Sequence, residues 1–505
     1  MLSDLGHIMR LARGGFVLAR EGAFVDIDAQ LLPPLARPLL RAANLLARRG
    51  AQGLQALPKA IDRLGPSYVK LGQFLSTRAD IVGPSVVARL ELLQDRMAPN
   101  SRDIAVASLE AAFGVKLDTL YSEFGEPVAA ASIAQVHRAK IRDADGERDV
   151  AVKILRAGVG RRFRRDLGDM FFAARWAERH IEASRRLRPV QVVETLARSV
   201  RIEMDFRLEA AAASEFAENC VADNDFGAPK IDWDRTTRDV LTMEWIDGAP
   251  LSDPARLEAM GYDNVRLARV LIQSFLKHAL RDGFFHADMH QGNLFVDAQQ
   301  RIIAVDFGIM GRLGLKERRF LAEILYGFIR RDYDRVARVH FDAGYVPSVH
   351  RVEDFAQALR AIGEPIHSRT ADQISMAKLL ALLLEITALF DMTTRIELVM
   401  LQKTMVVVEG VARKLDPKLN MWATAEPVVG AWIAENLGPR GRIEDIGIAV
   451  SRWAQFIASA PDKFDRLEQL LATPPLAAEE RLPRRMIWVL ALLFLLILWR
   501  LHSGD

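Results

Sequence analysis

The sequence predicts a mainly helical α+β fold built as two lobes, with a helical extension before them and an apolar helix after them. Apolar runs at 132–136, 150–154 and 240–246 are typical of strands, and a polar turn separates the first two. Helical patterns dominate before about residue 100, between 163 and 222, and from 316 to about 470. A small strand-rich lobe is therefore followed by a larger helical lobe.

This order divides the chain into four parts. Residues 1–100 form the helical extension, residues 101–248 the first lobe, residues 249–475 the second lobe, and residues 476–505 a linker with a terminal helix. Turn signals at Gly65-Pro66 and Thr473-Pro474-Pro475 separate predicted helices. A hinge between the lobes would leave a cleft, and such clefts are common ligand sites.

Composition excludes some classes of protein. The formal net charge is only +3, which gives no support for nucleic acid binding. Cys220 is the one cysteine, so we expect neither a disulfide framework nor a cysteine-based metal site, and we expect an intracellular protein. Residues 1–24 show no signal-peptide pattern. The local cluster of arginines is typical of a solvated helix face: Arg156, Arg161, Arg162, Arg164 and Arg165.

The strongest functional signal is the segment 286–293, His-Ala-Asp-Met-His-Gln-Gly-Asn, followed by Asp306-Phe307-Gly308. Asp288 precedes Asn293 by five positions, as the catalytic Asp precedes a metal-binding Asn in protein kinases. Asp288 would orient the nucleophile, while Asn293 and Asp306 would hold Mg²⁺ against the phosphates of ATP. Each piece alone has a plainer interpretation, such as a turn or a polar loop. Their joint spacing favours a protein-kinase-like fold.

A second set of residues fits the phosphate-binding parts of that fold. Lys153 ends a Val-Ala-Val-Lys strand pattern and would pair with the α- and β-phosphates. A buried ammonium needs a carboxylate, for which Glu203 and Glu209 are the candidates.

The phosphate loop departs from ordinary kinases, which have three glycines and a valine at the matching positions. This chain has Ala129, Ala131, Ala134 and Val136 there, with Ser132 inside the loop. A Cβ atom restricts positive φ and keeps backbone amides away from phosphate oxygens. We therefore expect a stiffer loop, an altered grip on the nucleotide and reduced phosphoryl transfer.

Two further segments bear on what the site would bind. Met243-Glu244-Trp245-Ile246 is typical of the hinge, where the Glu244 carbonyl and the Ile246 amide would meet the adenine edge. Ala287 replaces the arginine that reads a phosphorylated activation loop, and no Ala-Pro-Glu segment follows Gly308. A conventional protein substrate would have no obvious place to dock.

From about residue 25 to 315 the chain resembles the UbiB family of atypical kinases, also called the ADCK family. Residues 64–78, which include Lys70 and Gln73, resemble its KxGQ segment, and Glu203-Met204-Asp205-Phe206 resembles its ExD element. The resemblance implies that the KxGQ helix lies across the nucleotide cleft, with Lys70 facing Glu203 and Asp205. It also implies that Glu209 pairs with Lys153, and that ATP and Mg²⁺ are the cofactors. Met289 and Gln291 stand where the family usually has prolines, so we expect altered loop rigidity.

The same resemblance implies a role in the biosynthesis of ubiquinone or a related prenylquinone at a membrane. The implied partners are membrane lipid, prenylated quinone intermediates and other quinone-biosynthesis proteins, with a homodimer left open and no nucleic acid. Two alternatives are a small-molecule phosphotransferase of the aminoglycoside- or choline-kinase type and a non-catalytic, nucleotide-gated regulator. The KxGQ segment and the alanines disfavour the first alternative. The second is disfavoured because every residue that the chemistry needs is retained.

The apolar segment Met486–Trp499 is predicted to anchor the protein in a membrane. As a helix it spans roughly 21 Å, shorter than a bilayer core of roughly 30 Å, a length that would also suit a buried helix. Its two tryptophans near the boundaries and its flanking arginines favour the membrane. We therefore expect the protein at the cytoplasmic face of a bacterial inner membrane.

Overall fold

The computed structural model describes residues 2–25, 37–48, 53–76, 78–90, 92–93, 98–143, 146–367, 385–387, 389–392 and 396–437. The chain divides into two compact units, Met1–Ile433 and Ala434–Asp505, and nearly all described residues belong to the first. The expected linker at Thr473-Pro474-Pro475 and the expected membrane helix Met486–Trp499 lie outside the described residues. Within the described ranges, no helix is long and apolar enough to cross a membrane.

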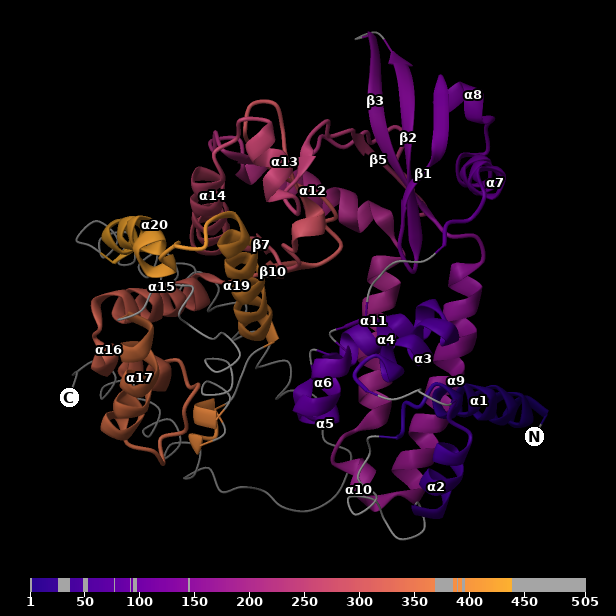
Figure 1. Ribbon diagram of the computed structural model, residues 1–505, viewed down its shortest axis with the longest axis horizontal. Helices are drawn as coiled ribbons and strands as arrows, with labels where there is room; N and C mark the ends of the chain where they lie inside the picture. Colours follow the sequence, from indigo (N-terminus) through magenta and orange to yellow (C-terminus); the bar gives the residue numbers. More distant parts are fainter. Residues whose placement is uncertain are drawn as a thin grey trace, which may run out of the picture. The chain divides into compact units, whose positions relative to one another are not determined.

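The first lobe contains an antiparallel sheet of strand order β1-β2-β3-β5, in which β2, β3 and β5 overlap the three predicted strands (Figure 1). Its strands are β1 (Glu123–Ala130), β2 (Ala134–Asp143), β3 (Gly146–Leu155) and β5 (Val240–Glu244). Val150, Val152 and Ile154 of β3 are buried in a small core with Leu109 of α7 (Arg102–Phe113), beside α8 (Leu117–Leu120). Because successive side chains of a strand alternate between faces, Lys153 points to the opposite face of the sheet.

The helical extension is also present as predicted where the chain is described. Its helices are α1 (Leu2–Arg20), α2 (Arg37–Leu45), α3 (Ala56–Leu64), α4 (Pro66–Ser76), α5 (Ala79–Val82) and α6 (Pro84–Leu90). Gly65 has φ of 96°, a conformation that favours glycine, and Pro66 then starts α4. At Gly72 an added Cβ would lie only 2.4 Å from Leu93 Cδ1, so the glycine allows close packing of α4.

Helices connect the sheet strands β3 and β5. They are α9 (Val159–His180), α10 (Glu182–Arg185), α11 (Pro189–Glu203) and α12 (Phe206–Asn219). Both α1 and α4 pack on α9. Helix α11 ends at Glu203, and the Asp205 side chain accepts a hydrogen bond from the Arg207 N–H to cap α12. Two acidic residues of the ExD element therefore lie at a break between helices.

The second lobe is helical with short strands. Strands β4 (Phe226–Gly227), β6 (Ala249–Pro250), β8 (Leu294–Val296) and β9 (Ile302–Ala304) form one sheet, and β7 (Phe284–His286) pairs with β10 (Met310–Arg312). The helices are α13 (Pro254–Ala259), α14 (Asn264–Lys277), α15 (Leu315–Arg330), α16 (Tyr333–Asp342), α17 (Val352–His367), α19 (Ile396–Leu415) and α20 (Met421–Asn436), and a π-helix spans His278–Asp282. Strands β8 and β9 connect Asn293 to Asp306.

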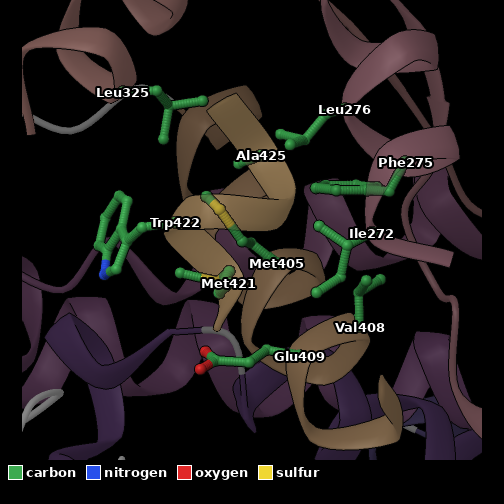
Figure 2. A pocket seen from close by; sticks show the side chains of 10 residues that line it. All are labelled: Ile272, Phe275, Leu276, Leu325, Met405, Val408, Glu409, Met421, Trp422 and Ala425. Atoms are coloured by element: carbon green, nitrogen blue, oxygen red, sulfur yellow. The ribbon is translucent and has the colours of Figure 1, made fainter. Parts of the chain in front are cut away.

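Four helices of this lobe surround an apolar pocket (Figure 2). Side chains from α14, α15, α19 and α20 line it, among them Phe275, Met405 and Trp422. Glu409 is its one charged lining residue, and its carboxylate accepts a hydrogen bond from Arg413. Burial raises the pKa of Glu409, while Arg413 opposes that rise. The pocket includes none of the residues predicted to bind nucleotide.

Candidate functional site

Lys153 lies between two carboxylates that come from distant parts of the sequence. Its Nζ donates to Glu209 Oε1 at 2.7 Å and to Asp306 Oδ1 at 3.0 Å. The ammonium also lies 5.5 Å from the centre of the Phe206 ring. Phe206 and Glu209 are three positions apart on α12 and so share one face of that helix. The Asp205 cap therefore fixes where α12 begins and which side chains reach Lys153.

One ammonium faces two carboxylates in this cluster, so its charges do not balance once Glu209 is ionised. Burial raises the pKa of Glu209 to about 7, although the Lys153 ammonium opposes the rise. Burial alone would lower the pKa of Lys153, but Asp306 and Glu209 raise it above its ordinary value. The pKa of Asp306 is lowered, since the positive charges of Lys153 and Lys70 outweigh the effect of burial. Such a cluster suits an additional cation.

Asp306 has an unusual backbone conformation. Its φ is 64°, in the left-handed region that non-glycine residues rarely adopt. The next residue, Phe307, is buried and packs its ring 5.3 Å from those of both Phe216 and His286. Buried packing after the aspartate thus holds a strained backbone, and the Asp306 side chain stays exposed on the site.

His286 connects the predicted catalytic loop to the strand end before Asp306. The Asp288 N–H donates to His286 Nδ1 at 3.1 Å, and His286 Nε2 lies 3.2 Å from the Val305 carbonyl oxygen. Nδ1 must therefore accept while Nε2 donates, which defines a neutral ring protonated on Nε2. Burial lowers the pKa of His286, in agreement with a neutral ring.

Asn293 completes this hydrogen-bonded unit. Its side-chain amide donates to the Asp288 backbone carbonyl oxygen at 3.1 Å. The Val305 N–H donates to the backbone carbonyl oxygen of Asn293 at 2.8 Å. The Asn293 amide nitrogen faces Asp288, so its amide oxygen is the atom that a metal would use. Asp288 has a partly exposed carboxylate, 3.8 Å from His290 Nε2. The predicted catalytic and metal-binding residues thus belong to one connected loop system.

The KxGQ helix α4 reaches the same region. Lys70 Nζ lies 2.7 Å from Glu203 Oε2, and both side chains are only 14% exposed. Lys70 also contributes to the lowered pKa of Asp306, although partial burial of that carboxyl acts in the opposite direction. Of the two expected partners of Lys70, Glu203 is the one in this ion pair, and Asp205 binds Arg207 at 2.7 Å. Gln73 lies on α4, half-buried.

The alanine loop connects β1 to β2. Ala129 pairs with Val136 in the sheet, and Ala131 donates its N–H to the Ala134 carbonyl at 2.8 Å. No residue between 129 and 136 has positive φ, and Ser132 is buried. Alanine can therefore adopt this backbone without strain. The stiffness of the loop remains a prediction.

Arg156 holds this loop from behind. Its guanidinium donates to the Ala131 carbonyl at 3.2 Å and to the Ala98 carbonyl at 2.7 Å. The backbone N–H of Arg156 donates to the Ile133 carbonyl at 2.9 Å. The prediction that Arg156 belongs to a solvated helix face was wrong. It precedes α9, and its contacts depend on segments that only the fold brings together.

The predicted hinge follows β5. Glu244 is the last residue of that strand, and its N–H donates to the Lys230 carbonyl at 2.8 Å. Ile246 lies in the connection to β6. Contacts of Glu244 and Ile246 with an adenine ring remain predictions.

Helix α19 supports the catalytic loop, which the sequence did not reveal. The buried Thr404 hydroxyl lies 3.0 Å from the Ala287 carbonyl oxygen and 2.8 Å from the Met400 carbonyl oxygen. Lys414 Nζ donates to Gln291 Oε1 at 3.0 Å. More than 100 residues separate Thr404 from Ala287 and Lys414 from Gln291, so no local pattern could have found these two contacts.

The segment after Gly308 is short and tied to α12. Strand β10 pairs with β7, and α15 begins at Leu315. Arg312 donates to Glu215 of α12 at 2.7 Å, and its guanidinium lies 4.3 Å from the centre of the Phe284 ring. This connection holds the helix that carries Glu209.

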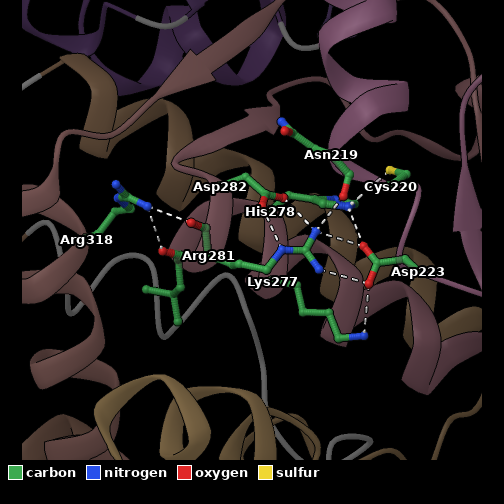
Figure 3. Close-up of polar contacts among 9 residues, drawn as sticks. Asn219, Cys220, Asp223, Lys277, His278, Arg281, Asp282 and Arg318 are labelled. Atoms are coloured by element: carbon green, nitrogen blue, oxygen red, sulfur yellow. Dashed lines mark hydrogen bonds and ion pairs between the residues drawn. The ribbon is translucent and has the colours of Figure 1, made fainter. Parts of the chain in front are cut away.

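A second polar cluster lies at the other end of α12 (Figure 3). Ligand atoms of Cys220, Asp223 and His278 lie within 4.8 Å of one another. The Asp223 carboxylate, however, already accepts from Arg281 at 3.0 and 2.9 Å and from Lys277 at 3.5 Å. Burial and Asp223 raise the pKa of the Cys220 thiol to about 12, which disfavours the thiolate that a metal needs. The cluster joins α12 to the π-helix, and its ion pairs disfavour a metal there.

The fold and this site define a protein-kinase-like domain: a strand lysine paired with a helix glutamate, a catalytic-type loop, and Asp-Phe-Gly. The family model for the ABC1 atypical kinase-like domain matches residues 92–340, and the model for the UbiB helical domain matches residues 359–420. A similar solved structure is that of Rv3197 from Mycobacterium tuberculosis in complex with erythromycin, with 25% identity over 78% of this chain and 97% of that chain and a TM-score of 0.50. The chain belongs to the UbiB family of atypical kinases.

Proposed function

We propose that this protein binds Mg-ATP beside Lys153 and acts as an atypical kinase or ATPase that supports ubiquinone or prenylquinone biosynthesis at a membrane. The observation that carries the proposal is the contact of Lys153 with both Glu209 and Asp306. In protein kinases the same lysine holds phosphates, the glutamate orients it, and the aspartate binds metal.

The residues present fit a magnesium ion. Asp306 offers an exposed, ionised carboxylate and Asn293 an amide oxygen, both of which Mg²⁺ prefers to nitrogen or sulfur. When Glu209 is ionised, Lys153, Glu209 and Asp306 together carry one more negative than positive charge, which a cation would offset. When bound, Mg²⁺ would stabilise negative charge that develops on the transferred phosphoryl group.

The chain's own residues would then divide the remaining work. Lys153 would hold the phosphates, and Glu209 would keep its ammonium in place. Asp288 would accept a proton from the attacking hydroxyl or water, because its carboxylate is partly exposed while its backbone is fixed by His286. The alanine loop would cover the phosphates without the flexibility of glycine.

The client of this chemistry is proposed from two observations. The short segment between Gly308 and Leu315 gives little room for a docked peptide. Lys70 of α4 pairs with Glu203 and its charge also acts on Asp306, which supports the proposal that α4 lies where such a peptide would pass. Both observations favour ATP hydrolysis or phosphoryl transfer that acts on a lipid-derived molecule. They disfavour phosphorylation of a conventional protein substrate.

The test is Asp306→Asn in the full chain. We expect Mg-ATP turnover to fall on the order of a hundredfold, because a ligand of a catalytic metal contributes several kcal/mol. Asp342→Asn, at an exposed carboxylate in α16, is the matched control and should retain full turnover. Turnover would be measured by phosphate release with lipid vesicles present.

A cellular measurement tests the quinone role separately. A strain that lacks this protein would be complemented with wild type, Asp306→Asn or Asp342→Asn, and its quinone content measured. We expect only Asp306→Asn to fail. Normal turnover in Asp306→Asn would contradict the nucleotide site, and normal quinone content despite lost turnover would contradict the biosynthetic role.

A further inference from the structure

Helix α1 docks on the protein through polar residues. His7 Nδ1 lies 2.5 Å from Asp169 Oδ1, and Arg10 donates to both oxygens of the same carboxylate at 2.7 Å. Asp169 is buried on α9, and the His7 ring stacks on Phe172 at 5.2 Å. Gly14 approaches the Tyr68 hydroxyl of α4. The inward face of α1 thus combines this ion pair with small or half-buried apolar residues such as Gly14, Leu18 and Ala19.

The apolar side chains of α1 point the other way. Leu5, Ile8, Met9 and Phe16 are 55%, 51%, 66% and 47% exposed. Their spacing of three, four and seven residues places them in one stripe along the helix. Because His7 and Gly14 mark the inward face, this stripe lies on the side away from the protein. A soluble helix normally turns its large apolar side chains toward the protein, so this exposed stripe indicates an apolar environment outside the molecule.

The exposed charged residues of α1 are Asp4, Arg13 and Arg20, two of which are positive. Arg13 and Arg20 are exposed one turn after Met9 and Phe16, and the Arg20 guanidinium lies 5.9 Å from the centre of the Phe16 ring. The supporting helix α9 exposes further arginines, while its carboxylates at Asp166 and Asp169 are buried: Arg161, Arg164, Arg165, Arg175 and Arg179. A second copy of the same face would bring like charges together. Phosphate headgroups would complement them.

We propose that the outward stripe of α1 lies in the surface of an anionic lipid bilayer. Helices of this type place their apolar face at the boundary between headgroups and acyl chains, with arginines among the phosphates. The apolar segment Met486–Trp499 of the same chain is a separate feature that agrees with a membrane location. The inference specifies the contact surface for the proposed membrane role, and its test requires no nucleotide, so it can fail or succeed independently of the ATP site.

The single cysteine makes a direct test practical. Cys220 is only 5% exposed, so Ile8→Cys in the full chain can be labelled selectively with the environment-sensitive fluorophore NBD. Val349→Cys, at a side chain that is 81% exposed outside α1, is the matched control. Each protein would be mixed with phosphatidylcholine vesicles with and without phosphatidylglycerol.

With phosphatidylglycerol present, we expect NBD emission at position 8 to shift to the blue and rise severalfold, with no change at position 349. An unchanged emission at position 8, on vesicles that still co-sediment the protein, would overturn the proposal. An equal shift on both kinds of vesicle would overturn its anionic part. A blue-shifted emission without vesicles would also overturn it. If that emission grows with protein concentration, a second copy covers the stripe; if it persists on dilution, the chain covers its own stripe.

A second variant removes the stripe itself. Leu5→Ser, Met9→Ser and Phe16→Ser together should lower vesicle affinity about tenfold or more, because each removes apolar area from the membrane. Val221→Ser, at another exposed apolar residue, should bind as wild type. Since all four positions are exposed, far-UV circular dichroism and thermal unfolding should be unchanged. Full vesicle affinity of the triple variant would contradict the assignment.

Discussion

Glu209 is the residue whose charge depends most on what binds beside it. Its pKa is raised to about 7, chiefly by burial, while Lys153 limits the rise. A divalent cation at Asp306 and Asn293 would favour the ionised carboxylate and so lower this pKa. The protein with metal and nucleotide bound would then hold fewer protons than the free protein. Affinity should therefore rise with pH up to about 7 and change less above it.

This linkage predicts proton release when Mg-ATP binds near neutral pH. Titration calorimetry in two buffers with different ionisation enthalpies would measure it. In Glu209→Gln the released proton should be absent, because the amide does not titrate, even though Lys153 keeps its contact with Asp306. Equal proton release from wild type and Glu209→Gln would show that another group titrates.

At the scale of single elements, α19 supports the predicted catalytic loop through Thr404. The Thr404 hydroxyl donates a hydrogen bond to the backbone carbonyl of Ala287, the residue before Asp288. Thr404→Val keeps the shape but removes the donor, which costs about 1 kcal/mol. We expect kcat to fall between about twofold and tenfold with KM nearly unchanged, since the loop is misplaced but the nucleotide contacts remain.

Thr404→Ser is the control for that prediction, because it restores the hydroxyl. Phosphate release at varied ATP concentration would separate kcat from KM. If Thr404→Ser is as slow as Thr404→Val, packing of the methyl group matters and the hydrogen bond does not. A purely structural role would lower thermal stability in step with activity.

The elements of the site differ in how far the sequence could predict them. The Val-Ala-Val-Lys pattern predicted Lys153 as a phosphate-binding residue, and the spacing of Asp288, Asn293 and Asp306 predicted that they serve one site. Hydrogen bonds of His286 and Asn293 link the segments that carry these residues, and their roles remain predictions. The contacts of Arg156 could not be predicted, because a local cluster of arginines does not show whether a side chain faces solvent or binds a carbonyl far along the chain.

The helices posed a different difficulty. Periodicity predicted that α1 is a helix but not which of its faces would dock, because the decisive partner, Asp169, lies on another helix far along the chain. The same holds for Thr404, whose role depends on α19 packing against α14 and the catalytic loop. Local patterns predict elements, whereas these roles arise from contacts between elements.

Within the first compact unit, the helical extension and the proposed nucleotide site are connected through α4. Helices α1 and α4 both pack on α9, Tyr68 of α4 approaches α1, and Lys70 of α4 binds Glu203. Both members of that ion pair are mostly buried, so the loss of one leaves the other charge without compensation. The ion pair is therefore the point at which movement of the extension would alter the site.

Lys70→Ala should loosen α4 and allow the site to reach the protein's own hydroxyl groups. We expect incorporation of labelled γ-phosphate into the chain to rise at least several-fold, while Lys59→Ala, at an exposed lysine of α3, should behave as wild type. A double-mutant cycle with Glu203→Gln should show a coupling on the order of 1–3 kcal/mol in unfolding free energy. If Lys70→Ala binds Mg-ATP normally but gains no self-phosphorylation, α4 does not restrict access. If the two substitutions are additive, the ion pair is not what holds α4 in place.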